Sequence, residues 1–87
     1  MASPTIQVTV RYFAAARSAA GAESETVPVR PGGTVADLVE SLAMRGAGLA
    51  EVLQRCSYLC DGIAVRDHNA ALRAGATIDV LPPFAGG

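Results

Sequence analysis

Hydrophobic and polar residues alternate in the first part of the chain. Within TIQVTVRYF, residues 5–13, the two sides of an extended backbone differ in composition. One side carries Ile6, Val8, Val10 and Tyr12, and the other carries Gln7, Thr9, Arg11 and Phe13. A period of two residues predicts a β-strand whose first side faces a core.

A second strand is predicted at residues 24–30, SETVPVR, with Val27 and Val29 facing inward. Pro28 lies between them and cannot donate a backbone hydrogen bond. We therefore expect this strand at the edge of a sheet, or with that position facing outward. The Ala-rich residues between the two strands, which include Gly21, are interpreted as a long connection within a hairpin.

A helix is predicted after the break that PGG forms at residues 31–33. Thr34 is a suitable N-cap residue, and Asp37 stands three positions later, in the second position of a capping box. The apolar residues of this segment recur at spacings of three and four, which is typical of a helix with one buried face. They are Val35, Leu38, Val39 and Leu42. We expect Gly46 to end the helix in the left-handed conformation, and a shorter helical turn to follow.

Three further strands complete the predicted fold. Asp61–Gly62 lies between two apolar runs, which is a strong hairpin signal. The last strand, residues 76–81, is expected to carry Ile78 and Val80 inward and Thr77, Asp79 and Leu81 outward. Two strands, one helix and three strands predict an α+β protein with a β-grasp fold. In it a mixed sheet of about five strands packs one main helix on one face.

The composition is that of one small globular domain. The chain has 87 residues, of which 51% are hydrophobic, and a formal net charge of −1. Without a broad basic field, nucleic acid is not expected as the main partner. We see neither the roughly 20 apolar residues of a membrane helix nor a secretory signal, so we expect a cytoplasmic protein. Residues 1–81 are expected to form the domain and residues 82–87 a flexible tail.

Few residues suggest catalysis or metal binding. Cys56 and Cys60 supply at most half of a zinc ligand set, and His68 is the only histidine, so no metal is expected. We interpret Cys60 as a core residue and Cys56 as incidental, and expect both to be dispensable. The acidic residues are scattered as solvated charges would be. Because no phosphate-binding or dinucleotide-binding loop is present, no stably bound cofactor is expected.

The chain ends on LPPFAGG, residues 81–87. Pro82 and Pro83 stop the preceding strand and stiffen the exit. Gly86 and Gly87 have no side chains that would keep them out of a narrow channel. A partner enzyme could therefore activate the terminal carboxylate as an acyl-adenylate. The pattern favours a carrier over an enzyme, because the sequence offers no base or oxyanion hole beside that carboxylate.

Phe13 and Leu81 lie off the core side of their strands, near the end of each. If the first and last strands pair in parallel, the two side chains meet on the open face of the sheet, beside the start of the tail. Such an apolar pair predicts a docking patch for a partner. Strand-end packing under the Ala-rich connection is the alternative interpretation.

Four segments give the chain a specific resemblance. They are VRYFAAAR near the start, GTVADLVESL on the predicted helix, CDGIAV in the hairpin and LRAGATIDVLPPFAGG at the end. Together they resemble the small subunits of molybdopterin synthases, which are ubiquitin-like sulfur carriers with a β-grasp fold. The resemblance runs from about Ile6 to Gly87, and the LPP-x-x-GG ending is its most specific element.

The resemblance implies a reaction sequence and partners. An E1-like adenylyltransferase would activate Gly87 with ATP, and a donor such as a cysteine desulfurase or rhodanese-type protein would supply sulfur for a thiocarboxylate. The sulfur would then pass to a pterin precursor within a heterotetramer that contains a large catalytic subunit. The residues implied to enter a pocket of that subunit are Phe84, Ala85 and Gly86. The residues implied to face it are Phe13, Leu81, Pro82 and Pro83.

Two departures and three alternatives remain open. Asp61 stands where the family often has Asn, and both residues suit that turn. Arg11 is polar where apolar residues also occur, which suggests altered partner contacts. Similar carriers serve thiazole or cysteine synthesis, a protein modifier would join Gly87 to a lysine of another protein, and a plain binding module would act through its sheet face. All seven basic residues are Arg. The lack of Lys fits a chain that avoids acylating itself, and fits a compositional bias equally well.

Overall fold

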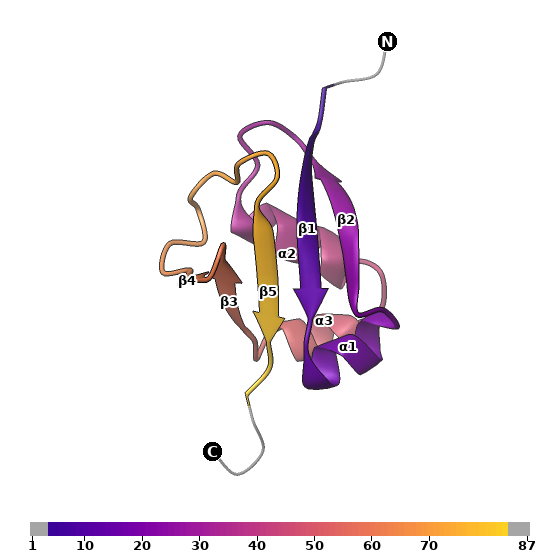
Figure 1. The fold of residues 1–87 in the computed structure, drawn as a ribbon. Coiled ribbons are helices and arrows are strands. Elements are labelled where there is room, and N and C mark those ends of the chain that lie inside the picture. Colours follow the sequence, from indigo (N-terminus) through magenta and orange to yellow (C-terminus); the bar gives the residue numbers. More distant parts are fainter. Residues whose placement is uncertain (1–3, 84–87) are drawn as a thin grey trace.

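The computed structural model describes residues 4–83, which form a mixed β-sheet with helices packed against one side (Figure 1). The strands are β1 Ile6–Tyr12, β2 Ser24–Val29, β3 Ser57–Cys60, β4 Ile63–Ala64 and β5 Thr77–Leu81. The helices are α1 Ala14–Ala20, α2 Val35–Ala43 and α3 Ala47–Leu53. The strand order is β2-β1-β5-β3-β4, with β1 parallel to β5 and the other neighbours antiparallel. This topology confirms the predicted β-grasp fold.

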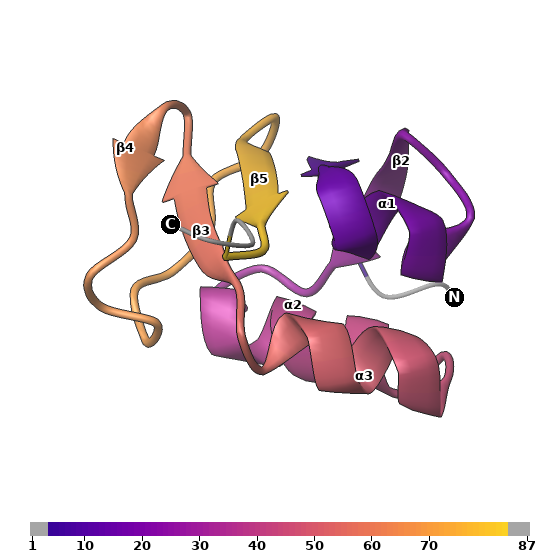
Figure 2. The same cartoon turned by 90° about the horizontal axis from the view of Figure 1, so that it is seen from below.

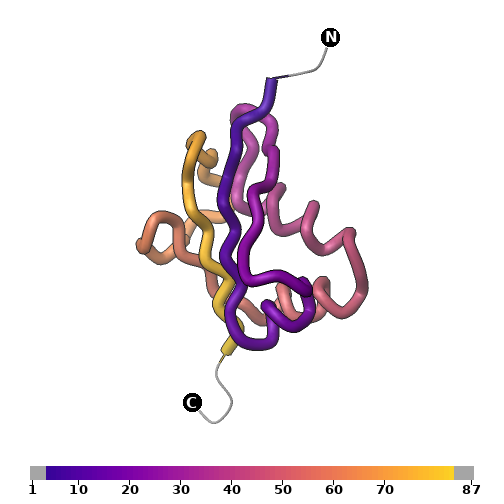
Figure 3. The backbone as a smooth tube through the Cα atoms, turned by 45° about the vertical axis from the view of Figure 1, so that its right-hand side comes forward, coloured from indigo at the N-terminus to yellow at the C-terminus, as the bar shows by residue number. Residues whose placement is uncertain are grey.

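The centre of the sheet follows the predicted alternation. β1 lies between β2 and β5 (Figure 3), and its residues Val8, Val10 and Tyr12 are buried. Ile78 and Val80 of β5 are fully buried on the same side. These side chains form one core with the buried faces of the helices, and no helix of residues 4–83 covers the opposite side of the sheet, called the open face below (Figure 2).

Helix α2 begins as predicted and ends differently. Thr34 Oγ1 accepts the Asp37 N–H at 3.1 Å, and the Asp37 carboxylate accepts the Thr34 N–H at 3.0 Å. The predicted left-handed stop at Gly46 is wrong, because Gly46 is extended (φ 175°) and is the N-cap of α3. The N–H groups of Met44 and Arg45 bond back into the helix instead, so the last turn closes without a left-handed residue.

Helix α1 replaces the long connection that the sequence predicted after β1. Ala has the highest helix propensity, and the Ala-rich run closes where Gly21 adopts a left-handed conformation (φ 75°). The Gly21 N–H donates to the Arg17 carbonyl, and Ala16 is buried. α1 therefore fills the end of the sheet and contacts α3, so the described chain has two short helices beside the one main helix expected.

The edges of the sheet agree with the turn and proline signals. β2 is an edge strand, and its Pro28 is exposed, as predicted. Asp61 (φ 50°) and Gly62 (φ 84°) form the tight turn between β3 and β4. The division into a domain and a tail after residue 81 stays a prediction, because residues 84–87 lie outside the described part of the chain.

Candidate functional site

The candidate site is the end of β5, where the chain leaves the sheet towards its Gly-Gly segment. The predictions for Phe84, Ala85, Gly86 and Gly87 concern residues outside the described range. Pro82 is buried and Pro83 is exposed, so the described chain is held in contact with the domain one residue beyond β5. The site is therefore built from the residues that surround this exit.

Parallel pairing brings Phe13 and Leu81 to the same end of the sheet. Tyr12 of β1 is in register with Val80 of β5, and the Phe13 N–H donates to the Val80 carbonyl at 3.2 Å. Phe13 is 38% exposed and Leu81 is half-buried. The two residues thus lie at the same end of the sheet, while their contact with each other and with a partner stays a prediction.

An ion pair lies beside this apolar pair on the open face. Arg11 is in register with Asp79 and donates to both of its carboxylate oxygens, from Nε at 2.6 Å and from a terminal nitrogen at 2.8 Å. This hydrogen bond and the carboxylate charge raise the pKa of Arg11, while desolvation opposes them. The Arg11 guanidinium also lies 5.8 Å from the centre of the Phe13 ring. The open face therefore presents a positioned cation next to an aromatic ring.

The burial of Asp79 corrects the sequence interpretation. Asp79 was expected to face outward as a solvated charge, and it does point to the open face, but only 5% of it is exposed. The reason is that the Arg11 side chain lies over it and supplies two hydrogen bonds. Sequence reasoning missed this pair because its partners are 68 positions apart. The available signal was that Arg11 and Asp79 carry opposite charges and both lie on the outward side of the first and last strands, which were expected to pair in parallel.

A second polar network lies at the same end of β1, on the core side. The Tyr12 hydroxyl donates to the Glu25 carboxylate at 2.8 Å, and Arg45 donates to the same carboxylate at 2.6 Å. Burial raises the pKa of Glu25, but the hydrogen bonds from Arg45 and Tyr12 outweigh it and the net pKa is lowered. Glu25 is thus another exception to the expectation of solvated acidic residues. The network fixes β1 and β2 to the segment that follows α2.

The two cysteines are not arranged for chemistry. Both are free and half-buried, and the Cys56 thiol donates to the Val52 carbonyl at 3.1 Å. Burial raises the pKa of both thiols, which keeps them protonated and poorly nucleophilic at neutral pH. His68 packs edge-on against Tyr58, with ring centres 5.7 Å apart.

Two absences apply to residues 4–83. Among them, no group of three or more His, Cys, Asp or Glu side chains is placed to hold a metal ion. The described helices are all too short or too polar to cross a membrane.

A shallow groove of about 340 Å³ adjoins the exit of the chain. Pro82 and Pro83 form one wall, and Ala15 of α1 and Val52 of α3 contribute apolar surface. Arg55 and Glu51, which form an ion pair, supply the polar part of the groove lining. The surroundings of the exit are therefore apolar with a charged border, and the described residues that line the groove include no His, Cys, Ser or Thr.

The strand order and the helix packing are those of ubiquitin-like β-grasp proteins. The model of the ThiS family matches residues 10–87. Because this match covers most of the sequence, the chain belongs to the ThiS family.

Individual relatives agree with this assignment. A molybdopterin synthase sulfur carrier subunit of Chlamydomonas reinhardtii is 29% identical over 83 residues, which cover 94% of this chain and 100% of that one. The solution structure of the HVO 2177 protein of Haloferax volcanii is 33% identical, with a TM-score of 0.84, and the match covers 95% of this chain and 88% of that one. A putative molybdopterin converting factor subunit 1 of Pyrococcus furiosus is 26% identical, with a TM-score of 0.82 and coverages of 91% and 99%. The resemblance predicted from the sequence is confirmed.

Proposed function

We propose that this protein is a sulfur carrier in molybdenum cofactor biosynthesis. The observation that carries the proposal is the similarity to a molybdopterin synthase sulfur carrier subunit, which extends over 94% of this chain and all of that relative. Membership of the ThiS family and the β-grasp fold support it.

The proposed reactive group is the carboxylate of Gly87. An E1-like adenylyltransferase joins it to AMP, using ATP and releasing pyrophosphate. The persulfide of a sulfur donor then displaces AMP to form an acyl disulfide, and a thiol cleaves this disulfide to leave the thiocarboxylate, being itself oxidised to a disulfide. The thiocarboxylate delivers its sulfur to a pterin precursor. ATP is a substrate of the activating enzyme in this scheme and is not a cofactor of the carrier. The scheme requires Gly87 to be the last residue of the mature chain, and the intact mass of the protein tests this requirement.

The proposed partner surface is the open sheet face around the exit of the chain. The large subunit of molybdopterin synthase would contact Phe13 and Leu81, which lie at the same end of the sheet because β1 and β5 pair in parallel, and Pro82 and Pro83, which follow Leu81. Phe84, Ala85 and Gly86 would enter the pocket of that subunit. A heterotetramer of two small and two large subunits in the cytoplasm completes the proposal.

The test is an intact-mass measurement on protein purified from its native host with an untagged C-terminus. Replacement of one oxygen by sulfur, localised to Gly87, is the expected result. The same product should form in vitro with the E1-like enzyme of the same genome, ATP and a sulfur donor. A plain carboxylate in every molecule under both conditions would refute the proposal, and conjugates to lysines of other proteins would identify a modifier instead.

A truncated chain provides the control. Removal of Gly86 and Gly87 should abolish sulfur transfer and leave binding to the large subunit largely intact, because the docking residues belong to the folded domain. Sulfur transfer by the truncated chain would show that the reactive group lies elsewhere.

A further inference from the structure

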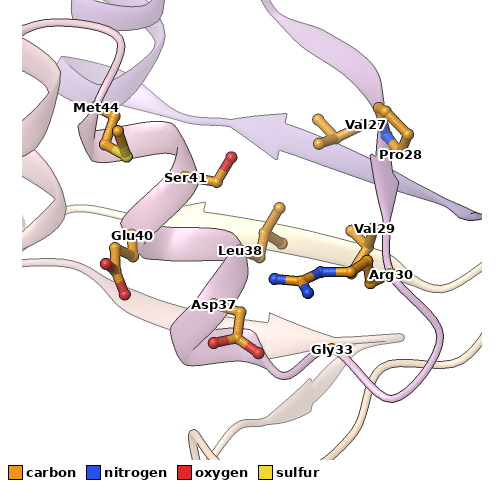
Figure 4. Close-up of a pocket in the computed structure, with 10 residues that line it drawn as sticks. All are labelled: Val27, Pro28, Val29, Arg30, Gly33, Asp37, Leu38, Glu40, Ser41 and Met44. Atoms are coloured by element: carbon orange, nitrogen blue, oxygen red, sulfur yellow. The ribbon is translucent and has the colours of Figure 1, made fainter. Parts of the chain in front are cut away.

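A groove of about 350 Å³ separates the edge strand β2 from α2 (Figure 4). Val27, Val29 and Leu38 give it an apolar floor, and Met44, which is 82% exposed, lies at one end. Arg30, Asp37, Glu40 and Ser41 supply the polar lining. In Figure 4 the Arg30 side chain extends from the end of β2 towards the helix, across this space. The groove therefore combines an apolar base with charges of both signs.

The groove adjoins a row of free backbone groups. Tyr12 donates its N–H to the Glu23 carbonyl, so Tyr12 and Glu23 form a hydrogen-bonded pair of the β1–β2 ladder. In an antiparallel ladder these pairs alternate, and the next ones are Val10 with Glu25 and Val8 with Val27. The backbone groups of Ser24, Thr26 and Pro28 consequently point away from β1, towards the free edge of the sheet.

Proline and a turn limit how much of this edge can pair. Pro28 has no N–H, and the Arg30 carbonyl already accepts a hydrogen bond from the Gly33 N–H at 2.8 Å. Beside the groove, the edge thus offers the N–H and carbonyl of Thr26 and the carbonyl of Pro28. Such a short row suits a peptide of a few extended residues. It does not suit a long strand or a symmetric pairing with a second copy of β2.

The charges on α2 select the kind of peptide. Asp37 and Glu40 stand one turn apart on the helix, and within residues 4–83 neither carboxylate lies within 4.0 Å of an Arg nitrogen. Arg30 supplies the opposite charge, on a side chain that starts at the end of β2 and extends across the groove. A basic side chain that reaches the helix side of the groove would therefore be attracted, while an acidic one would be repelled.

We propose that the groove between β2 and α2 binds a short extended segment of a partner protein. The segment adds to β2 through the backbone of Thr26 and Pro28 and places branched aliphatic side chains over Val27, Val29 and Leu38. A following Lys or Arg lies against Glu40. This is strand addition to a sheet edge, in which the main chain supplies affinity and the groove supplies specificity.

The groove lies away from the exit of the chain. β2 is antiparallel to β1, and β1 is parallel to β5, so Val27–Arg30 lies at the opposite end of the sheet from Leu81. A partner seated on β2 would leave the open face and the exit of the chain at Pro83 free for another protein. The inference does not depend on the proposed sulfur-carrier function, since it concerns a different edge and is tested by binding alone.

The test is an NMR titration of the full ¹⁵N-labelled chain with the synthetic peptide acetyl-Ser-Val-Ile-Val-Lys-Lys-amide. The expected result is a set of shifts confined to Thr26, Arg30, Glu40 and Ser41, with a Kd of about 1 mM or tighter. No shift at a peptide concentration of about 5 mM, or shifts confined to the open face, would overturn the proposal. A control peptide with Glu in place of both Lys residues should bind more weakly, and equal binding would contradict the role of Glu40.

A matched pair of proline variants tests the backbone pairing. Thr26→Pro removes the N–H beside the groove without touching a β1–β2 hydrogen bond, and should weaken peptide binding by roughly 3- to 10-fold. Ser24→Pro makes the same change at the preceding outward-pointing position, two residues farther along β2 from the groove, and should leave affinity unchanged. Equal effects of the two variants would refute strand addition.

Two further measurements keep the proposal testable. If Thr26→Pro fails to fold, Ser41→Trp fills the groove from the exposed face of α2 and should abolish binding. Sedimentation of the free chain should show a monomer at NMR concentrations. A dimer that Ser41→Trp dissociates would assign the groove to a second copy of this chain and overturn the peptide proposal.

Discussion

The hydrogen bond from Tyr12 to Glu25 lends itself to a quantitative test. Tyr12→Phe removes only the hydroxyl, which donates to Glu25 at 2.8 Å, and leaves the ring in a core position that is 1% exposed. Glu25 keeps its hydrogen bond from Arg45 at 2.6 Å. The perturbation therefore isolates one donor to a charged acceptor, with little change in packing.

The size of the effect follows from the geometry. A hydrogen bond to a charged group contributes about 1.5 to 3 kcal/mol. The remaining Arg45 contact and the partial exposure of Glu25 reduce the contribution of the Tyr12 hydrogen bond. We therefore expect Tyr12→Phe to lower the free energy of unfolding by about 1 to 2 kcal/mol at neutral pH. For a domain of this size the melting temperature should fall by about 4 to 8 °C for each kcal/mol.

The loss should depend on pH in a defined direction. The folded state lowers the pKa of Glu25, so the stabilisation is present above its unfolded pKa and disappears as the pH falls through the lower folded value. Below that value the carboxyl is protonated in both states, and the Tyr12 hydroxyl loses its charged acceptor. The difference between wild type and Tyr12→Phe should therefore shrink in acid.

The assay is urea unfolding of both proteins from pH 7 down to about pH 3. Tyr58→Phe is the matched control, because its buried hydroxyl donates at 2.8 Å to the neutral Leu53 carbonyl. That variant should lose stability by an amount that does not change with pH. A Tyr12→Phe difference that stays constant from pH 7 to about pH 3 would refute the role of the Glu25 charge.

Four further substitutions test the cap of α2, the start of α1 and the partner surface. Thr34→Ala should cost about 1 kcal/mol, measured by urea unfolding, because the Asp37 N–H loses its acceptor; an unchanged midpoint would contradict the capping box. Ala14→Gly should stabilise the domain by up to about 1 kcal/mol, since Ala14 has φ 51°, where a Cβ is unfavourable; a lower melting temperature would contradict this reasoning. Phe13→Arg and Leu81→Arg should each weaken binding to the large subunit by about tenfold or more without unfolding the domain. Titration calorimetry measures this affinity, and an unchanged value would remove the docking patch.

Local sequence patterns predicted most of the fold. The alternation in β1 and β5 sorted their residues onto the two sides of the sheet, because successive strand residues point to opposite faces. Thr34 and Asp37 marked the start of α2, and Asp61–Gly62 marked the β3–β4 turn. Each signal depends on residues a few positions apart, whose backbone geometry is set by their own side chains.

The sequence alone was less informative where two local outcomes compete. The Ala-rich run after Phe13 is compatible with a helix and with an irregular connection. Gly46 is compatible with the end of one helix and with the start of the next. The contact of α1 with α3 and the burial of Ala16 favour the helix. These contacts come from other parts of the chain, which a local pattern does not contain.

The tertiary structure decided the surroundings of the exit. Sequence parity placed Phe13 and Leu81 on the open face, but only the parallel β1–β5 pairing brings them to the same end of the sheet. The same pairing joins Arg11 to Asp79 and buries a carboxylate that its sequence neighbours would leave in water. The sequence thus determined which side of each strand a residue occupies, because that depends on neighbouring residues. The strand register determined which side chains meet, because hydrogen bonding between distant segments sets it.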